Sequence, residues 1–295
     1  MAQGLSPADA AQLIPASALA RIPGCGTGVR PDAVEVLHGG TVNRGFRVDT
    51  HCGRFVLRLN DATGELLGAN HDREARLHAA AALGGVAPAL IYADPNGRFM
   101  IMRYIDGPTW EPADFGRRER LCTLGATLRE LHAVRPPAVA PFDLGAILRR
   151  YSAQLADALP AERGLLEGLM ESAGSSLALC KSGARRHCIV HNDLHHSNLV
   201  EGERLYLIDW EYAAVADPIF DIACVLAYYP HAAPHAQEFL AAAGLAEEVS
   251  PATLARASSL FVHLSFLWYR LRRLSGAVDA ADIAAENGLL KRLSA

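Results

Sequence analysis

The residue pattern changes near residue 104 from one typical of strands to one typical of helices, and this change constrains the fold more than any other feature of the sequence. Before it, runs of β-branched and aromatic residues alternate with Gly-bearing turns, and after it longer helical periodicities take over. The first part predicts strands at 34–37, 45–49, 54–59, 89–92 and 98–102, with a helix from Asn70 to Leu83 after the third strand. This order predicts a small antiparallel sheet with one helix.

The second part, from about Pro112 onward, is expected to be mainly helical. Between residues 121 and 132, for example, four leucines fall on one face of a helix. Gly107 and Pro108 end the sheet, and we interpret residues 104–108 as a hinge above a nucleotide cleft. The sequence therefore predicts an α+β fold with an N-terminal lobe at residues 1–104 and a C-terminal lobe at residues 105–295.

Composition excludes several classes of protein. The net charge is −4 and no run of Lys and Arg dominates, which argues against a nucleic-acid partner. The six cysteines lack paired metal-ligand spacing, as expected for reduced, mostly buried thiols in the cytoplasm. Ser6-Pro7 looks like a helix start, not a secretory signal, and the apolar stretch at 260–269 is too short to cross a bilayer. We expect a cytoplasmic protein without membrane insertion.

The most informative motif runs from His191 to Asn198 and continues at residues 208–211. It provides Asp193, Asn198 and Asp209 at the spacing that kinase-type phosphoryl transfer requires. In that chemistry one Asp orients the substrate hydroxyl and accepts its proton, while an Asn and a second Asp hold Mg²⁺. Runs at 189–190 and 205–208 read as short buried strands, and residues 201–203 read as a turn between residues 199–200 and the second run. The three polar groups are therefore expected at strand ends around one hairpin.

The residues of this motif also allow two other interpretations. His191 and His195 stand four residues apart with Cys188 upstream, which is conceivable as a zinc site, but no second ligand cluster follows. Asp and Asn are also common turn residues, which explains either residue alone but not the set.

Four motifs between residues 37 and 229 resemble, in the same order, those of kinase-like phosphotransferases, which include aminoglycoside phosphotransferases, thiamine kinase and choline/ethanolamine kinases. The segments at 210–213 and 217–223 look more like bacterial choline kinases. The resemblance implies a two-lobed protein-kinase-like fold, with a small antiparallel sheet lobe and a larger, mainly helical lobe. It also implies ATP and Mg²⁺ as cofactors.

The resemblance assigns nucleotide-binding candidates to the first lobe: Gly39, Gly40, Thr41, Asn43, Arg58, Glu74, Met102 and Tyr104. The glycines, with Thr41 and Asn43, look like the loop that covers the phosphates. Arg58 stands where kinases carry a phosphate-binding Lys, and Glu74 would pair with it. The glycines are also compatible with a simple hairpin turn, Arg58 with an edge strand facing water, and Glu74 with a surface ion pair.

Catalytic roles follow from the same resemblance. Asp193 is the expected base, Asn198 and Asp209 are the expected magnesium ligands, and His191 is expected to pack under the loop and orient it. We expect Asp217 to cap a helix and Asp221 to brace the catalytic loop by hydrogen bonds.

The acceptor candidates are Glu211, Trp210, Tyr228, Trp268 and Tyr269. Aromatic faces and a carboxylate suit a quaternary ammonium, although aromatic residues on apolar helices are commonly core residues. The arginines at 270, 272 and 273 argue against a polycationic aminoglycoside.

The expected function is an ATP- and Mg²⁺-dependent kinase acting on the hydroxyl of a small cationic alcohol, choline or ethanolamine, as a monomer or homodimer. Aminoglycoside phosphotransferase, thiamine kinase and a non-catalytic, pseudokinase-like binding module are the alternatives.

Overall fold

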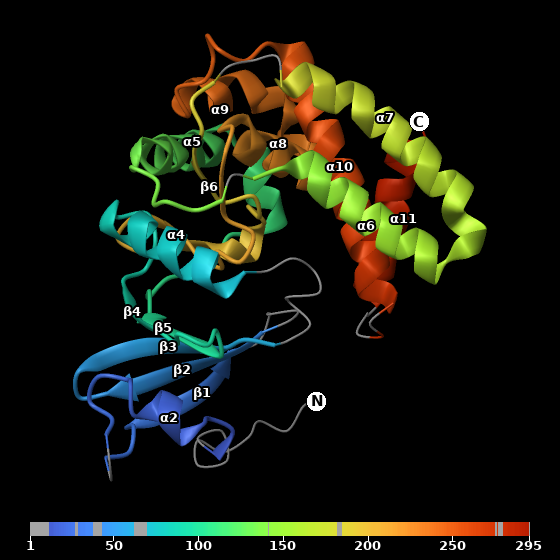
Figure 1. The fold of residues 1–295 in the computed structure, drawn as a ribbon. Coiled ribbons are helices and arrows are strands. Elements are labelled where there is room, and N and C mark those ends of the chain that lie inside the picture. The colour runs from blue at the N-terminus through green and yellow to red at the C-terminus, as the bar shows by residue number, and fades with distance from the viewer. Residues whose placement is uncertain are drawn as a thin grey trace. The chain divides into compact units, whose positions relative to one another are not determined.

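The computed structural model describes residues 12–26, 29–37, 43–61, 70–140, 142–181, 185–274, 276 and 280–294. The chain forms two compact units, whose elements are labelled in Figure 1. Unit 1 comprises Met1–Trp110 and Ser197–Tyr212, and unit 2 comprises Glu111–His196 and Ala213–Ala295. Unit 1 therefore extends past the boundary expected at residue 104 and takes in a second, later segment of the chain.

Unit 1 contains a sheet of β1 (Ala33–Leu37), β2 (Arg44–Thr50), β3 (Gly53–Leu59), β4 (Leu90–Ala93) and β5 (Phe99–Arg103). The strand order is β1-β2-β3-β5-β4 and every pair is antiparallel. Helix α4 (His71–Leu83) connects β3 to β4. The Asn70 side chain accepts the backbone N–H of Arg73 at 2.9 Å, and Gly85 follows with a left-handed φ of 77°. The predicted order of strands and helix is confirmed.

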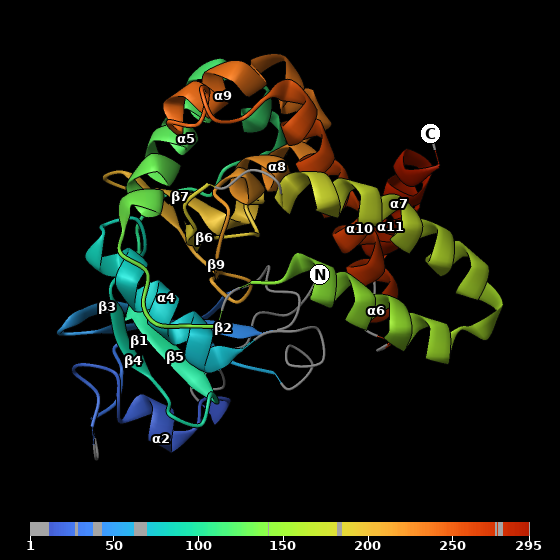
Figure 2. The ribbon, with the colours of Figure 1, turned by 45° about the horizontal axis from the view of Figure 1, so that its top comes forward.

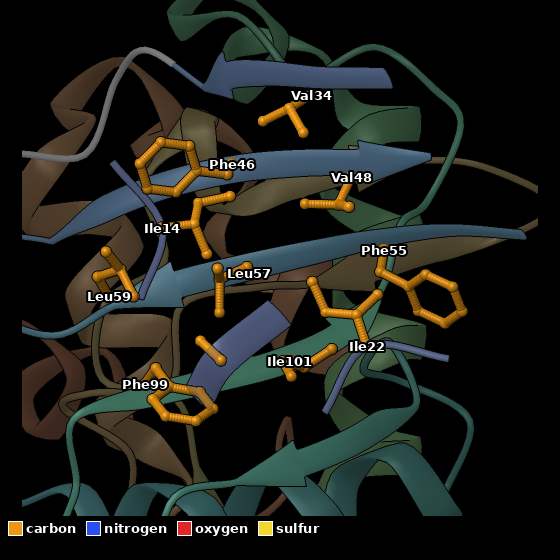
Figure 3. Close-up of a cluster of buried hydrophobic side chains, with 11 residues drawn as sticks. Ile14, Ile22, Val34, Phe46, Val48, Phe55, Leu57, Leu59, Phe99 and Ile101 are labelled. Carbon is orange, nitrogen blue, oxygen red and sulfur yellow. The ribbon is translucent and has the colours of Figure 1, made fainter. Parts of the chain in front are cut away.

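The two faces of this sheet differ in character. Alternate residues of β2, β3 and β5 point to one face, where they form an apolar cluster closed by Ile14, Ala18 and Ile22 from the segment around α2 (Ala16–Leu19) (Figure 3). Arg58 is flanked along β3 by Leu57 and Leu59, which belong to this cluster, so its side chain points to the opposite face. Because successive side chains of a strand point to opposite faces of the sheet, Arg58 lies on the face opposite the apolar cluster.

Unit 1 also takes in a two-stranded hairpin of β7 (Leu199–Glu201) and β8 (Leu205–Leu207). Main-chain hydrogen bonds attach it to the end of the first segment: the Trp110 N–H donates to Leu199 O at 3.0 Å and the Glu201 N–H to Pro108 O at 2.9 Å. Gly107 permits this approach, because a Cβ at that position would clash with the carbonyl oxygen of Glu201. These bonds explain why Ser197–Tyr212 belongs to unit 1.

Unit 2 is mainly helical (Figure 2). Its α-helices are α5 (Arg118–Ala133), α6 (Leu144–Ala158), α7 (Arg163–Lys181), α8 (Ile219–Tyr228), α9 (Ala236–Ala242), α10 (Pro251–Leu274) and α11 (Ala280–Leu293). Short 3₁₀ helices lie at Pro112–Gly116, Pro160–Glu162 and Pro230–His235, and another, His196–Asn198, spans the junction of the units. The α5 leucines at 121, 124, 128 and 131 are fully buried, as their spacing predicts. Helix α10 packs against α6, α7, α8 and α11.

A second short sheet in unit 2 pairs β6 (Cys188–Val190) with β9 (Ala214–Ala216). The hairpin predicted around residues 201–203 is confirmed as β7–β8. The sequence did not reveal β9, the strand with which β6 pairs. The fold class is α+β, as predicted. Within the described residues, no helix combines the length and apolarity needed to cross a membrane.

Candidate active site

A buried ion-pair network in unit 1 centres on Arg58. Its guanidinium lies 2.5 Å from Glu74 Oε1 and 2.8 Å from Asp209 Oδ1, and its Nε donates to Asn60 Oδ1 at 3.1 Å. Arg58 lies on β3, between β2 and β5, and is only 8% exposed, so the edge-strand interpretation is wrong. Glu74, at 1% exposure, faces Arg58, as the kinase resemblance implied.

The charge state of Glu74 depends on this network. Burial acts to raise the pKa of its carboxyl, but the positive charge of Arg58 and hydrogen bonds from His71 and Arg58 outweigh it. The pKa of Glu74 therefore lies below its usual value, and the side chain stays ionised in the interior.

The β7–β8 hairpin brings the two expected magnesium ligands to the same end of its ladder. Leu199 pairs with Leu207, and the Ile208 N–H donates to Asn198 O at 3.0 Å, so Asn198 and Asp209 come directly before β7 and shortly after β8. Asp209 has a left-handed φ of 61°. A carboxylate and a carboxamide are hard oxygen donors of the kind that Mg²⁺ accepts, and Mg²⁺ commonly takes its remaining ligands from phosphates and water. The residues present therefore fit this ion.

Asn43 links the start of β2 to the segment after Asp209. Its Nδ2 donates to Glu211 Oε2 at 3.1 Å, and its Oδ1 accepts the Asp61 N–H at 3.1 Å. The other predicted residues of the phosphate-covering loop, Gly39, Gly40 and Thr41, lie outside the described residues.

Met102 and Tyr104 lie at the end of β5 and just beyond it. Met102 is 9% exposed, and the Tyr104 ring lies under the guanidinium groups of Arg47 and Arg54, at 5.0 and 5.9 Å. Their assignment to nucleotide binding remains a prediction.

In unit 2, Asp193 lies three residues after β6 and has two polar neighbours. The Tyr228 hydroxyl donates to its Oδ1 at 2.9 Å, and His195 Nε2 lies 3.5 Å from its Oδ2. Burial acts to raise the pKa of Asp193, but the charges of His195 and His191 and the hydrogen bonds from His195 and Tyr228 lower it below its usual value. Asp193 is therefore an ionised hydrogen-bond acceptor at neutral pH.

The loop that carries Asp193 is held by Asp221 on α8. One oxygen of Asp221 accepts the N–H groups of His191 and Asn192, each at 2.9 Å, and the other lies 2.9 Å from His132 Nε2. Asn192 has a left-handed φ of 64°, and His191 is fully buried beneath the loop. The expectation that Asp221 braces the loop matches these bonds. Asp217 accepts the Ile219 N–H at 3.0 Å, as expected of a helix cap.

Sequence reasoning missed His132. It lies four residues after Leu128, on the buried face of α5, and is 8% exposed. The sequence does contain a sign of its role, because a polar residue at a core position of a leucine-lined helix face needs a buried hydrogen-bond partner.

The phosphotransferase enzyme family (APH) matches this chain over residues 33–258. The chain belongs to this family. It is 27% identical over 206 residues to protein LicA of Haemophilus influenzae, a match that covers 68% of this chain and 60% of that protein. This phosphotransferase thus aligns with less than two thirds of the length of that relative.

Solved structures show the same fold. A choline/ethanolamine kinase family protein of Mesorhizobium loti is 26% identical, with a TM-score of 0.77 over 94% of this chain and 92% of the other. Choline kinase LicA of Streptococcus pneumoniae is 19% identical, with a TM-score of 0.76 over 91% and 95%. These similarities confirm the protein-kinase-like fold that the motifs implied.

The acceptor candidates of the phosphotransferase occupy different surroundings. Trp210 is fully buried, packs against the ring of His78 at 6.0 Å and donates its indole N–H to Leu207 O at 3.0 Å, which are contacts of a core residue. The rings of Trp268 and Tyr269 meet edge to face at 5.0 Å, and the Arg272 guanidinium lies 5.4 Å from the Trp268 ring.

Tyr228 is the acceptor candidate that contacts Asp193 directly. Burial, and then the charge of Asp193, raise the pKa of its hydroxyl well above the usual value, with smaller contributions from Cys224 and Tyr269. Tyr228 therefore stays protonated and can donate, and Tyr269 is near enough to share its surroundings. Their assignment to the acceptor, like that of Trp268 and Glu211, remains a prediction.

The arginines of α10 are paired with carboxylates. Arg270 pairs with Glu162 and with Glu286 at 2.7 Å, and Arg272 pairs with Asp282 at 2.9 Å. Arg273 lies 3.6 Å from the same Glu286. Because these carboxylates offset the arginine charges, the electrostatic argument against a polycationic acceptor is weaker than the sequence implied.

Proposed function

We propose that this phosphotransferase is an ATP- and Mg²⁺-dependent kinase that phosphorylates the hydroxyl of choline or a related amino-alcohol such as ethanolamine. The observation that carries the reaction type is the ionised Asp193, held by Tyr228 and by a loop fixed to α8, in a chain that also provides the Arg58, Glu74 and Asp209 network. Kinase-type phosphoryl transfer needs a carboxylate that accepts the proton of the acceptor and a set of charged residues that hold the phosphates and the metal ion.

In the proposed reaction, Asp193 orients the acceptor hydroxyl and accepts its proton as the oxygen attacks the γ-phosphoryl group of ATP in line. The bond between the γ-phosphorus and the β–γ bridging oxygen breaks, and ADP leaves. Arg58 positions Asp209 and provides a fixed cation, and Glu74 in turn holds Arg58 in place. Asn198 and Asp209 would hold Mg²⁺, which neutralises charge on the phosphate oxygens. Residues 1–104 would cover the nucleotide, and residues 105–295 would supply the catalytic loop and bind the acceptor.

The choice of acceptor rests on two supports. The relatives with the choline kinase and choline/ethanolamine kinase names share the fold along nine-tenths or more of this chain. Tyr228, which donates to Asp193, and Tyr269, which lies near Tyr228, provide aromatic faces that suit a quaternary ammonium, each worth about 0.5 to 2 kcal/mol. We further propose that the enzyme acts in the cytoplasm, as a monomer or homodimer.

An aminoglycoside is the second candidate acceptor, and one observation favours it. The carboxylates that offset the α10 arginines weaken the expected repulsion of a polycation. Thiamine, another cation with a primary hydroxyl, belongs in the same comparison.

A panel assay tests the proposal. ADP release is measured with ATP, Mg²⁺ and, separately, choline, ethanolamine, thiamine and kanamycin, with Asp193→Asn as the matched control in every arm. We expect turnover with choline or ethanolamine that the control lacks. Turnover with kanamycin or thiamine alone would refute the acceptor. Magnesium-dependent ATP binding without turnover on any alcohol would indicate the non-catalytic binding module.

A further inference from the structure

The thiol of Cys224 contacts both peptide groups that flank the candidate base. Cys224 lies on α8 and is fully buried. Its Sγ donates to the carbonyl oxygen of Asn192 at 3.4 Å and accepts the N–H of Leu194 at 3.4 Å. One peptide group precedes Asp193 and the other follows it, so a single side chain bonds to the backbone on both sides of that residue.

This position matters because the backbone there is strained. Asn192 has a φ of 64°, a conformation that non-glycine residues adopt at a cost. Asp221, three residues before Cys224 and so on the same face of α8, bonds the N–H groups of His191 and Asn192, which lie upstream of Asp193. Cys224 adds a bond downstream, at Leu194, so the two residues of α8 hold the loop on both sides of the base.

The two bonds require a neutral thiol. A thiolate accepts hydrogen bonds but cannot donate, so Asn192 O would lose its donor. Burial raises the pKa of Cys224 well above its usual value, and the charge of Asp193 raises it further. The S–H form that donates to one peptide group and accepts from the other is therefore the form present at neutral pH.

We propose that Cys224 is a positioning residue that fixes the backbone of Asp193, and with it the direction in which the carboxylate meets the acceptor hydroxyl. The inference rests on the proposed kinase function of Asp193. The thiol acts only through the peptide groups of the loop and takes no part in the transfer itself.

A pair of cysteine-to-alanine variants isolates the effect. Cys224→Ala removes the bonded thiol, whereas Cys188→Ala removes a thiol that is equally buried, at 2% exposure, and makes no hydrogen bond within the described residues. Both variants lose the same atom from the interior of unit 2. Any loss of activity or stability that arises only from the cavity left by the missing sulfur atom should therefore be similar in the two variants.

For Cys224→Ala we expect kcat to fall about tenfold, because small misplacements of a catalytic group reduce rates strongly, while KM for ATP stays within about twofold. Cys188→Ala should keep kcat within about twofold of the parent. The kcat of Cys224→Ser should lie between those of the parent and the alanine variant. A hydroxyl can still donate one hydrogen bond and accept the other, but it prefers contacts of about 2.8 Å, shorter than the 3.4 Å found here.

Hydrogen exchange at the Leu194 amide provides a readout that needs no turnover. Its exchange should accelerate in Cys224→Ala and stay unchanged in Cys188→Ala, because only the first loses the acceptor of that N–H. Equal kcat values, or equal exchange rates, in the two alanine variants would overturn the inference. If the parent protein phosphorylates no alcohol, the proposed function fails, and the exchange comparison still decides whether the thiol fixes the loop.

Discussion

Removing Arg58 should destabilise the protein far more than removing a typical arginine. Arg58→Met leaves Glu74, at 1% exposure, without its main countercharge in the interior. Breaking a buried ion pair in this way costs about 3–5 kcal/mol in the free energy of unfolding. Asp209, whose side chain is 33% exposed, loses a partner too but can regain water, so we assign most of the cost to Glu74.

The double variant Arg58→Met, Glu74→Leu separates that cost from lost packing. Replacing a buried pair by apolar residues of similar size is often nearly neutral, so the double variant should recover most of the stability that the single variant loses. Arg76→Met is the matched control on the surface of α4. Arg76 lies 3.8 Å from Asp72 with both side chains at least half exposed, and its removal should change the free energy of unfolding by less than about 0.5 kcal/mol.

The effect of Arg58→Met should also depend on pH. In the parent, the lowered pKa of Glu74 contributes stability that is present above its ordinary value of 4.5 and is lost as pH falls through the folded-state pKa. Without Arg58, burial acts on that pKa against the hydrogen bond from His71 and the charge of His78 alone, so the pKa rises and Glu74 contributes less stability at neutral pH. The difference between variant and parent should therefore be large at pH 7.5 and small near pH 4.

Urea unfolding followed by circular dichroism at the two pH values measures these differences. A single variant that loses no more stability than Arg76→Met, or a double variant less stable than the single one, would refute the assignment of a buried, charged Glu74.

Three further outcomes are expected. Asp193→Asn should lower kcat by about 10²- to 10⁴-fold while the Kd for ATP, measured by calorimetry, hardly changes, and activity within a few-fold of the parent would contradict its role as base. Tyr228→Phe removes a bond that lowers the pKa of Asp193, so the acidic limb of kcat/KM against pH should move to higher pH; an unmoved limb would count against the contact. Asp221→Ala leaves two buried N–H groups without their acceptor and should cost about 1–3 kcal/mol for each in urea unfolding.

The sheet of unit 1 could be predicted from the sequence because its signals are local. Alternating β-branched and aromatic residues specify each strand, and Asn70 and Gly85 mark the two ends of α4 through their own side chain and backbone. The position of Arg58 could not be predicted in the same way. Whether β3 lies at an edge or in the middle depends on its pairing with β5, forty residues further along the chain, and no local pattern encodes that.

In the candidate catalytic segment, too, some features can be predicted from the sequence and others cannot. Asp193, Asn198 and Asp209 are predicted as site residues because their chemistry and spacing are visible in the sequence. The strand β9 was missed, because Ala214 and Ala216 have low strand propensity and the strand exists only through its pairing with β6. The offset arginines of α10 were misjudged for a similar reason, since one of their partners, Glu162, precedes Arg270 by more than a hundred residues.

Two residues with left-handed backbone conformation help to explain why Asn and Asp occur where they do in the segments 191–198 and 208–211. Among the described residues, Asn192 and Asp209 are the non-glycine residues with positive φ, at 64° and 61°. Asn and Asp tolerate this conformation better than other side chains, and such strain persists where surrounding bonds determine the backbone. Asp221 and the Cys224 thiol bond the two sides of Asn192, and Arg58 holds the side chain of Asp209. The proposed magnesium site needs an oxygen ligand at position 209, and the backbone there needs a residue that accepts positive φ. Asp satisfies both needs. At position 192 the positive φ of the backbone alone suffices to favour Asn.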